Sequence, residues 1–119
     1  KNRMKKIYHL STCNTTQNIL KEVDAVKKGT TLQDIKTEKI TPAQIDEMKK
    51  LSGSYESLFS RRALKYKSMG LKGKQLTEKD YRKLILEEYT FLKRPVAIVS
   101  NKIFIGNTKA VVAALKDAL

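Results

Sequence analysis

The fold of this chain is decided by residues 6–20, KIYHLSTCNTTQNIL. Ile7 and Tyr8 favour a short strand, and the polar residues after it favour a turn that leads into a helix. Cys13 therefore stands at the start of a helix, where unpaired backbone N–H groups and the helix dipole favour a thiolate over a thiol. The pattern predicts a reactive sulfur. The alternative is that Cys13 is a small buried core residue, as many lone cysteines are.

Length and composition predict a single domain over residues 1–119. The chain has 119 residues, of which 40% are hydrophobic, enough for one core. Its single cysteine excludes an internal disulfide, and its single histidine leaves too few ligands for a zinc site, so no metal and no bound cofactor is predicted. A reducing, cytoplasmic location follows as an expectation. No apolar run is long enough to span a bilayer, so no membrane contact is predicted.

The formal net charge of +13 indicates a general preference for anions. The basic residues come as doublets spread along the whole chain and interrupted by acids, with few aromatic residues among them. This distribution makes nucleic acid an unlikely partner and leaves an acidic protein as a candidate. Most of these side chains are expected to cover solvated faces.

The first half of the chain predicts a strand–helix–strand unit. The helix after Cys13 is expected to end near Lys28–Gly29, and a second strand to span Thr31 to Ile35. Two strands joined by a helix imply a right-handed parallel crossover. The residues expected on the inner face of this helix are Ile19, Leu20, Val23 and Val26.

The middle of the chain, about 41–89, predicts a helical insertion. Thr41–Gln44 reads as a capping box with proline at the first helical position, for a helix that stops at Ser52–Gly53. A second helical segment is expected over Ser57 to Met69 with a break near Ser60–Arg62. Thr77 caps a third helix that runs to about Glu88.

The last part of the chain predicts a β-hairpin followed by a helix. Val96–Val99 is a continuous apolar run, as expected of a buried strand, and a turn at Asn101–Lys102 leads into an antiparallel strand over Ile103–Ile105. Asn107 or Thr108 then caps the final helix. Pro95 suits the start of the buried strand, and the bond before it is one that can be cis.

These segments together resemble the thioredoxin fold: an α/β architecture with a four-stranded mixed sheet, built as βαβ, a helical insertion and ββα. Three segments resemble the arsenate-reductase (ArsC) family more narrowly, and that family also contains the Spx-type transcription regulators. The resemblance extends from Lys6 to Leu119. The segments that carry it are Tyr8-His9-x-x-x-Cys13, the stretch from Leu58 to Leu71, and Leu92-Lys93-Arg94-Pro95-Val96.

The family resemblance implies a thiolate nucleophile at Cys13. His9 would help to lower the pKa of the cysteine when protonated, and Arg94 would hold an anion beside the sulfur. From the residues alone, His9 is equally well a core strand residue. The alternative for Arg94, a surface ion-pair partner, is disfavoured by its position directly before Pro95. Arsenate would be attacked by the cysteine, the adduct resolved by glutathione, and the mixed disulfide reduced by glutaredoxin. The further oxyanion-binding positions implied are Asn14, Thr15, Thr16, Arg62 and Pro95.

The sequence also departs from both family patterns. Glu56 and Gly106 stand where arginines of the arsenate reductases are expected, which puts arsenate turnover in doubt. Cys13-Asn14-Thr15-Thr16 lacks the second cysteine of the Spx switch, so an internal disulfide cannot form. Two functions are therefore carried forward: a glutathione- or glutaredoxin-linked thiol oxidoreductase, and a non-enzymatic interaction module of the Spx kind that binds an acidic protein.

Overall fold

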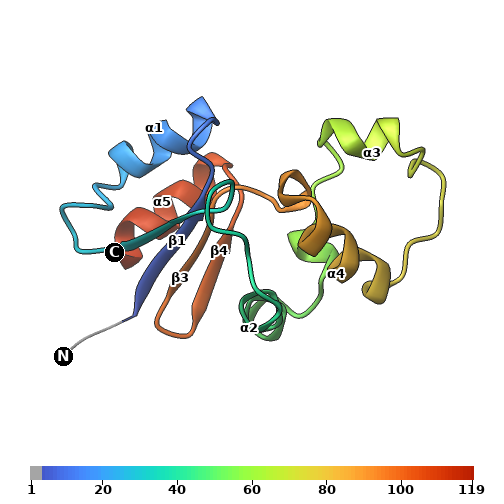
Figure 1. Ribbon diagram of the computed structural model, residues 1–119. Helices are drawn as coiled ribbons and strands as arrows, with labels where there is room; N and C mark the ends of the chain where they lie inside the picture. Colours follow the sequence, from blue (N-terminus) through green and yellow to red (C-terminus); the bar gives the residue numbers. More distant parts are fainter. Residues whose placement is uncertain (1–3) are drawn as a thin grey trace. The chain divides into compact units, whose positions relative to one another are not determined.

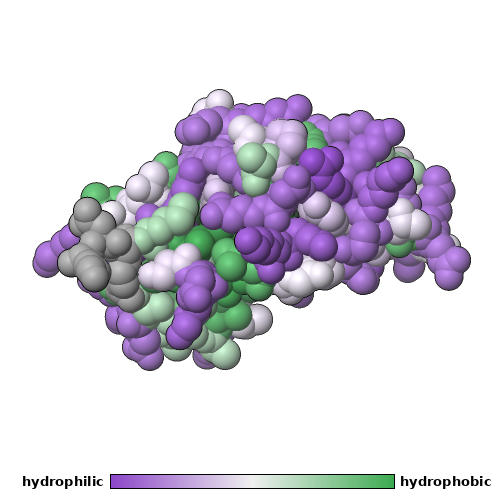
Figure 2. Space-filling view, turned by 90° about the horizontal axis from the view of Figure 1, so that it is seen from below, coloured by the Kyte–Doolittle hydropathy of each residue, from purple (hydrophilic) through white to green (hydrophobic). Residues whose placement is uncertain are grey.

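The computed structural model describes residues 4–119, which form two compact units. The first unit contains the chain up to Glu38 together with Arg94–Leu119, and the second is Lys39–Lys93. Hydrophilic side chains cover most of the face shown in Figure 2, as the large net charge requires, and hydrophobic ones gather in one patch. None of the helices between residues 4 and 119 has the length and hydrophobicity needed to cross a membrane.

The first unit is a four-stranded mixed sheet with order β2-β1-β3-β4, which confirms the predicted fold class. β1 pairs parallel to β2 and antiparallel to β3, and β3 pairs antiparallel to β4. Figure 1 shows the sheet with the helices α1 and α5 beside it. The strands and helices of this unit are β1 (Lys5–His9), α1 (Asn14–Glu22), β2 (Thr31–Asp34), β3 (Val96–Val99), β4 (Lys102–Ile105) and α5 (Lys109–Ala118).

The core of the first unit lies between one face of the sheet and the two helices. Alternate strand residues supply the sheet side, because successive side chains of a strand point to opposite faces. Burial of these apolar side chains holds α1 against the sheet. The position of the first residue of α1 relative to the strands is therefore fixed as well. The buried residues of the cluster are Ile7, Ile19, Leu20, Val23, Ala25, Ala97, Val99, Val112 and Leu115.

The first helix is shorter than predicted. It ends at Glu22 rather than near Lys28–Gly29, because Asp24 adopts a left-handed φ of 55° and the N–H of Ala25 donates to the carbonyl of Leu20. This is a Schellman-type end at a residue other than glycine. Val26, which was expected on the inner face, is 75% exposed, and the prediction for it was wrong. Ala25 is buried in its place.

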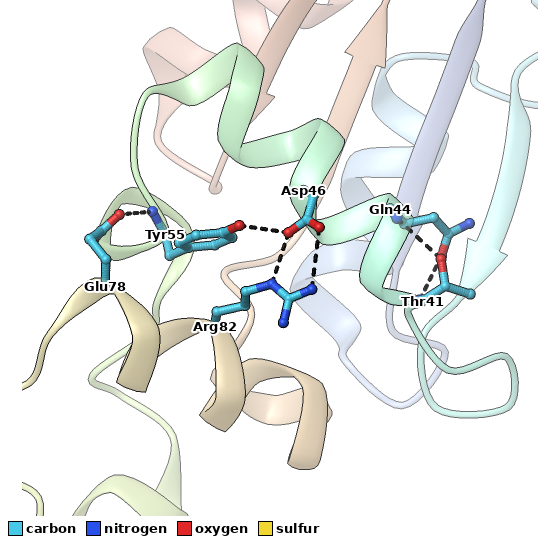
Figure 3. Close-up of polar contacts among 6 residues, drawn as sticks. All are labelled: Thr41, Gln44, Asp46, Tyr55, Glu78 and Arg82. Carbon is cyan, nitrogen blue, oxygen red and sulfur yellow. Dashed lines mark hydrogen bonds and ion pairs between the residues drawn. The ribbon is translucent and has the colours of Figure 1, made fainter.

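The second unit consists of helices, as the sequence predicted for the insertion. Its elements are α2 (Pro42–Ser52), η1 (Glu56–Leu58), α3 (Leu64–Ser68), α4 (Glu78–Glu87) and η2 (Tyr89–Phe91). The predicted caps are confirmed: Thr41 and Gln44 form a reciprocal capping box (Figure 3), and Thr77 forms another with Asp80. The segment expected over Ser57 to Met69 consists of the 3-10 helix η1 and the five-residue helix α3, and the turn at Arg61–Arg62 between them confirms the predicted break.

An ion pair links α2 to α4 inside the second unit. Arg82 donates from Nε to Oδ1 of Asp46 at 2.9 Å and from Nη2 to Oδ2 at 3.2 Å, and the Tyr55 hydroxyl donates to Oδ1 at 2.6 Å (Figure 3). The hydrogen bonds from Arg82 and Tyr55 lower the pKa of Asp46 from 3.8 to about 2. This carboxylate thus joins two helices and the turn between them.

We predict that Asp46→Asn destabilises the protein near neutral pH and that this deficit shrinks in acid. A folded-state pKa below the unfolded value stabilises the fold fully above pH 3.8, and this stabilisation is lost as pH falls toward about 2. Urea unfolding of both proteins across this range, followed by circular dichroism, measures the difference. Glu47→Gln, at the neighbouring carboxyl, is the matched control. A deficit of Asp46→Asn that is equally large near pH 2 would contradict the assignment.

Candidate active site

The site is built on the turn that joins β1 to α1. The N–H of Cys13 donates to the carbonyl of Leu10 at 3.0 Å, which closes the turn, and the carbonyl of Cys13 accepts from Gln17 at 3.0 Å, which starts the helix. Cys13 has extended φ and ψ of −101° and 108° and is the N-cap residue of α1. It therefore stands where the sequence predicted it, at the positive end of a helix whose first turn has no acidic side chain.

Asp34, at the end of β2, holds the same turn from the neighbouring strand. Its Oδ1 accepts the N–H of Ser11 at 3.2 Å and that of Lys36 at 3.1 Å. Its burial would raise the pKa of Asp34, but the hydrogen bonds from Ser11 and Lys36 and the nearby His9 lower it. An ionised carboxylate accepts such bonds more strongly than a neutral one, so Asp34 fixes the conformation of the turn before Cys13.

The pKa of the Cys13 thiol lies below its ordinary value. Burial of the half-buried sulfur would raise this pKa. Hydrogen bonding by the side chain and the backbone N–H of Thr16, together with the charge and hydrogen bonding of Arg94, outweighs that effect. These groups stabilise the thiolate, which is the nucleophilic form of cysteine.

Thr16 is the third residue of α1, and its hydroxyl is the unusual polar group of the site. Thr16 is 1% exposed, and its Oγ1, which acts on the thiolate of Cys13, has no other hydrogen-bond partner within residues 4–119. An unsatisfied buried hydroxyl is costly, and a negatively charged sulfur at the N-cap would give it an acceptor. Ionisation of Cys13 therefore satisfies a group that is otherwise unpaired.

Arg94 and Pro95 precede β3. The peptide bond between them is cis, Pro95 is buried, and its carbonyl accepts the N–H of Gly106 at 2.9 Å. This bond ties the start of β3 to the end of β4, so the half-buried Arg94 is held at the edge of the sheet that carries Cys13. A guanidinium in this position supplies a permanent positive charge beside the sulfur.

His9 contacts the first helix through Gln17. Nε2 of Gln17 lies 2.9 Å from the carbonyl oxygen of Leu10 and 3.1 Å from Nδ1 of His9. Because the carbonyl can only accept, the amide nitrogen donates to both atoms, and the neutral imidazole carries its proton on Nε2. The role predicted for a protonated His9 at the sulfur stays a prediction.

The other predicted site residues are distributed between the two units. Asn14 and Thr15 are exposed in the first turn of α1, beside Cys13, and contribute the backbone of the helix start. Arg62 is exposed and belongs to the second unit, between η1 and α3. Cys13, Thr16 and Arg94 are thus the predicted residues that interact directly in the first unit.

Glu56 and Gly106, the two positions where the resemblance led us to expect arginines, have local structural roles. Glu56 is exposed and forms an ion pair with Arg61 at 3.0 Å inside the second unit. Gly106 has φ of 95°, a left-handed conformation that is strained for any other residue, and its N–H is used by Pro95. The backbone at position 106 therefore favours glycine over arginine.

Sequence reasoning missed Gln17, Asp34 and Ser11. Gln17 follows Cys13 by one helical turn, a spacing that places it over the start of the helix and could have indicated a contact with the turn. Nothing in the local sequence around Asp34 indicates its bond to Ser11, because the two are brought together by the pairing of β1 and β2.

The four-stranded mixed sheet, with the βαβ unit before it in the chain and the ββα unit after the insertion, defines the class of the protein, a thioredoxin-like α/β protein. The sequence profile of the ArsC family matches residues 8–115. The chain belongs to the ArsC family. Comparison with curated proteins gave no significant match.

Solved structures of arsenate reductases and related proteins share the fold. The arsenate reductase from Vibrio cholerae superposes with a TM-score of 0.79 at 12% identity, over 100% of both chains. An arsenate reductase (ArsC) related protein from Brucella melitensis gives 0.72 at 21% identity, over 93% of this chain and 92% of the other. At these identities the likeness establishes the fold.

We predict that Thr16→Val slows alkylation of Cys13 by iodoacetamide near neutral pH. Loss of a hydrogen bond to a charged group raises the thiol pKa, and each unit of increase removes about tenfold of the thiolate. Since a more basic thiolate is also more nucleophilic, the net slowing is about three- to tenfold.

Thr30→Val is the matched control for Thr16→Val. Thr30 Oγ1 is also buried without a partner, but Thr30 precedes β2, at the end of the sheet opposite to Cys13. The wild-type alkylation rate is expected for this variant. Equal slowing by the two substitutions would show that Thr16 acts through stability alone.

Proposed function

We propose that the protein is a thiol oxidoreductase of the arsenate-reductase type, with Cys13 as its nucleophile and glutathione or glutaredoxin as the thiol that resolves the adduct. The observation that carries the proposal is the position of the half-buried Cys13 at the N-cap of α1, where Thr16 and Arg94 act on it to lower its pKa. A core cysteine would have neither an exposed sulfur nor cationic neighbours. A reducing, cytoplasmic setting belongs to the same proposal.

The proposed chemistry transfers two electrons through Cys13. With a disulfide substrate, the thiolate attacks one sulfur, a new S–S bond forms, and the other sulfur leaves as a thiolate. With an oxyanion such as arsenate, the sulfur displaces an oxygen that leaves as water, and attack by glutathione then gives the reduced product and a Cys13–glutathione disulfide. In each case a further thiol returns Cys13 to the reduced form.

A groove in the first unit could receive glutathione. It begins at Thr15, two residues after Cys13, and runs between α1 and the start of α5. Glu22 and Lys109 give it one acidic and one basic side chain, which complement the ammonium and carboxylate groups of the tripeptide. The remaining lining residues are Asn18, Ile19, Asn107 and Val112.

Arsenate is a weaker candidate than a disulfide for the first substrate. Arg94 is the guanidinium that acts on Cys13, while positions 56 and 106 carry glutamate and glycine. Fewer fixed cations stabilise a multiply charged oxyanion less well, whereas attack on a neutral disulfide sulfur needs chiefly the thiolate. We therefore expect faster reaction with glutathione disulfide than with arsenate.

Incubation with glutathione disulfide followed by intact mass measurement tests the proposal. We predict that the wild type gains one glutathione and that Cys13→Ser gains none. Lys109→Gln should slow the gain several-fold, because it removes the cation of the groove. Lys116→Gln, on the last turn of the same helix, serves as the matched control and should react at the wild-type rate.

An unmodified wild type under conditions that glutathionylate a reactive reference thiol would refute the proposal. Arsenate reduction is measured separately, in an assay that couples glutathione and glutaredoxin to the oxidation of a reduced nicotinamide. Turnover of arsenate as fast as turnover of the disulfide would show that Arg94 suffices for the oxyanion.

A second function, binding of an acidic protein partner, is favoured by the charge of the second unit. From residue 57 to residue 77 the chain carries six basic side chains and no acidic one. This role does not require the sulfur of Cys13, so binding that survives Cys13→Ser would support it.

A further inference from the structure

The basic segment of the second unit, residues 57–77, carries a local excess of positive charge. Its lysines and arginines are closely spaced, and no acidic residue stands among them. The six basic residues, all exposed, are Arg61, Arg62, Lys65, Lys67, Lys72 and Lys74.

One of these six has a structural role. Arg61 donates to Glu56 at 3.0 Å and to the Tyr81 hydroxyl at 2.8 Å. The other five form no ion pair with an acidic side chain in the described part of the chain. Like charges held close together repel. An anionic partner that neutralises them therefore lowers the electrostatic free energy of this surface.

The short helix α3 is oriented by Tyr66. The ring of Tyr66 meets the ring of Phe59 edge to face, with centroids 6.0 Å apart. Phe59 is itself fully buried against Tyr81 and Phe91. Because successive helical residues are about 100° apart, Leu64, Lys65 and Lys67 then point away from this aromatic cluster.

Leu64 and Met69 are exposed apolar residues among these cations. Leu64 is 89% exposed and Met69 is 45% exposed. The chain on either side is anchored, since Ala63 and Leu71 are buried and the N–H of Leu71 donates to the carbonyl of Tyr66. The backbone on both sides of α3 is therefore fixed, and it holds the Leu64 side chain in an exposed position.

We propose that this surface, formed by α3 and the residues up to Lys74, docks an acidic protein segment that carries an apolar side chain. The apolar group would cover Leu64, while carboxylates would face Lys65 and Lys67, which flank it on α3. The proposal locates the acidic-partner role on the molecule and is independent of the thiol chemistry of Cys13.

Nucleic acid fits this surface less well than an acidic protein. Single-stranded nucleic acids are bound by aromatic side chains on which the bases stack. The ring of Tyr66 already packs against the ring of Phe59 and does not offer such a surface. A duplex reader presents a helix to a groove, and α3 has five residues, about two turns at most. Contacts with phosphates are electrostatic and are made by Lys and Arg side chains, so the exposed Leu64 would not contribute to them.

Fluorescence anisotropy tests the proposal with a labelled, glutamate-rich peptide that carries leucines at helical spacing. The full chain, with Cys13→Ser to remove thiol chemistry, should bind this peptide more tightly than a peptide with serines in place of the leucines. Leu64→Ser should weaken binding of the leucine peptide about tenfold, since it removes the apolar contact. Lys65→Gln with Lys67→Gln should weaken both peptides and reduce the salt dependence.

Matched controls come from the first unit. Val26→Ser replaces another exposed apolar residue next to lysines, and Lys27→Gln with Lys116→Gln removes the same charge. Neither is expected to change peptide binding. Wild-type affinity in Leu64→Ser, or tighter binding of a short duplex DNA than of the leucine peptide, would overturn the proposal. Failure here would leave the reaction of Cys13 with glutathione disulfide unaffected.

Discussion

The stabilisation of one negative charge at the N-cap of α1 is the constraint on which the site depends. Cys13 can be held as a thiolate because the helix begins at the next residue, because Thr16 offers a backbone N–H and a buried hydroxyl with no other partner, and because Arg94 lies beside the sulfur. Moving the start of the helix by one residue would turn the sulfur away from these groups. The sheet prevents this, since β1 is paired on both sides.

The same arrangement explains why elements distant in the sequence meet at one edge of the sheet. β1 and β2 run parallel, so His9 and Asp34 are register partners at their carboxyl ends. β3 runs antiparallel to β1, so Arg94 and Pro95, which precede β3, come to that same edge. The sheet order therefore assembles a thiol, a carboxylate that fixes the turn and a guanidinium.

Most of the fold follows from local sequence signals. The capping box at Thr41 and Gln44 and the apolar run Val96–Val99 are decided by nearby residues, and both predictions are confirmed. Val26 was misjudged because apolar periodicity assumes that a helix continues. The left-handed residue Asp24 ends the first helix early, and the contact between Tyr66 and Phe59 turns α3 so that Leu64 faces water. At the site, Gln17 and Asp34 act through contacts that exist only once the strands have paired.

Titration of the thiolate absorbance against pH shows directly whether the site stabilises the anion of Cys13, because this is the only cysteine of the chain. We predict a midpoint clearly below the value of about 8.5 of an unperturbed thiol. A midpoint at or above that value would show that Thr16, Arg94 and the helix start do not stabilise the anion. The proposed nucleophile would then be an ordinary half-buried cysteine.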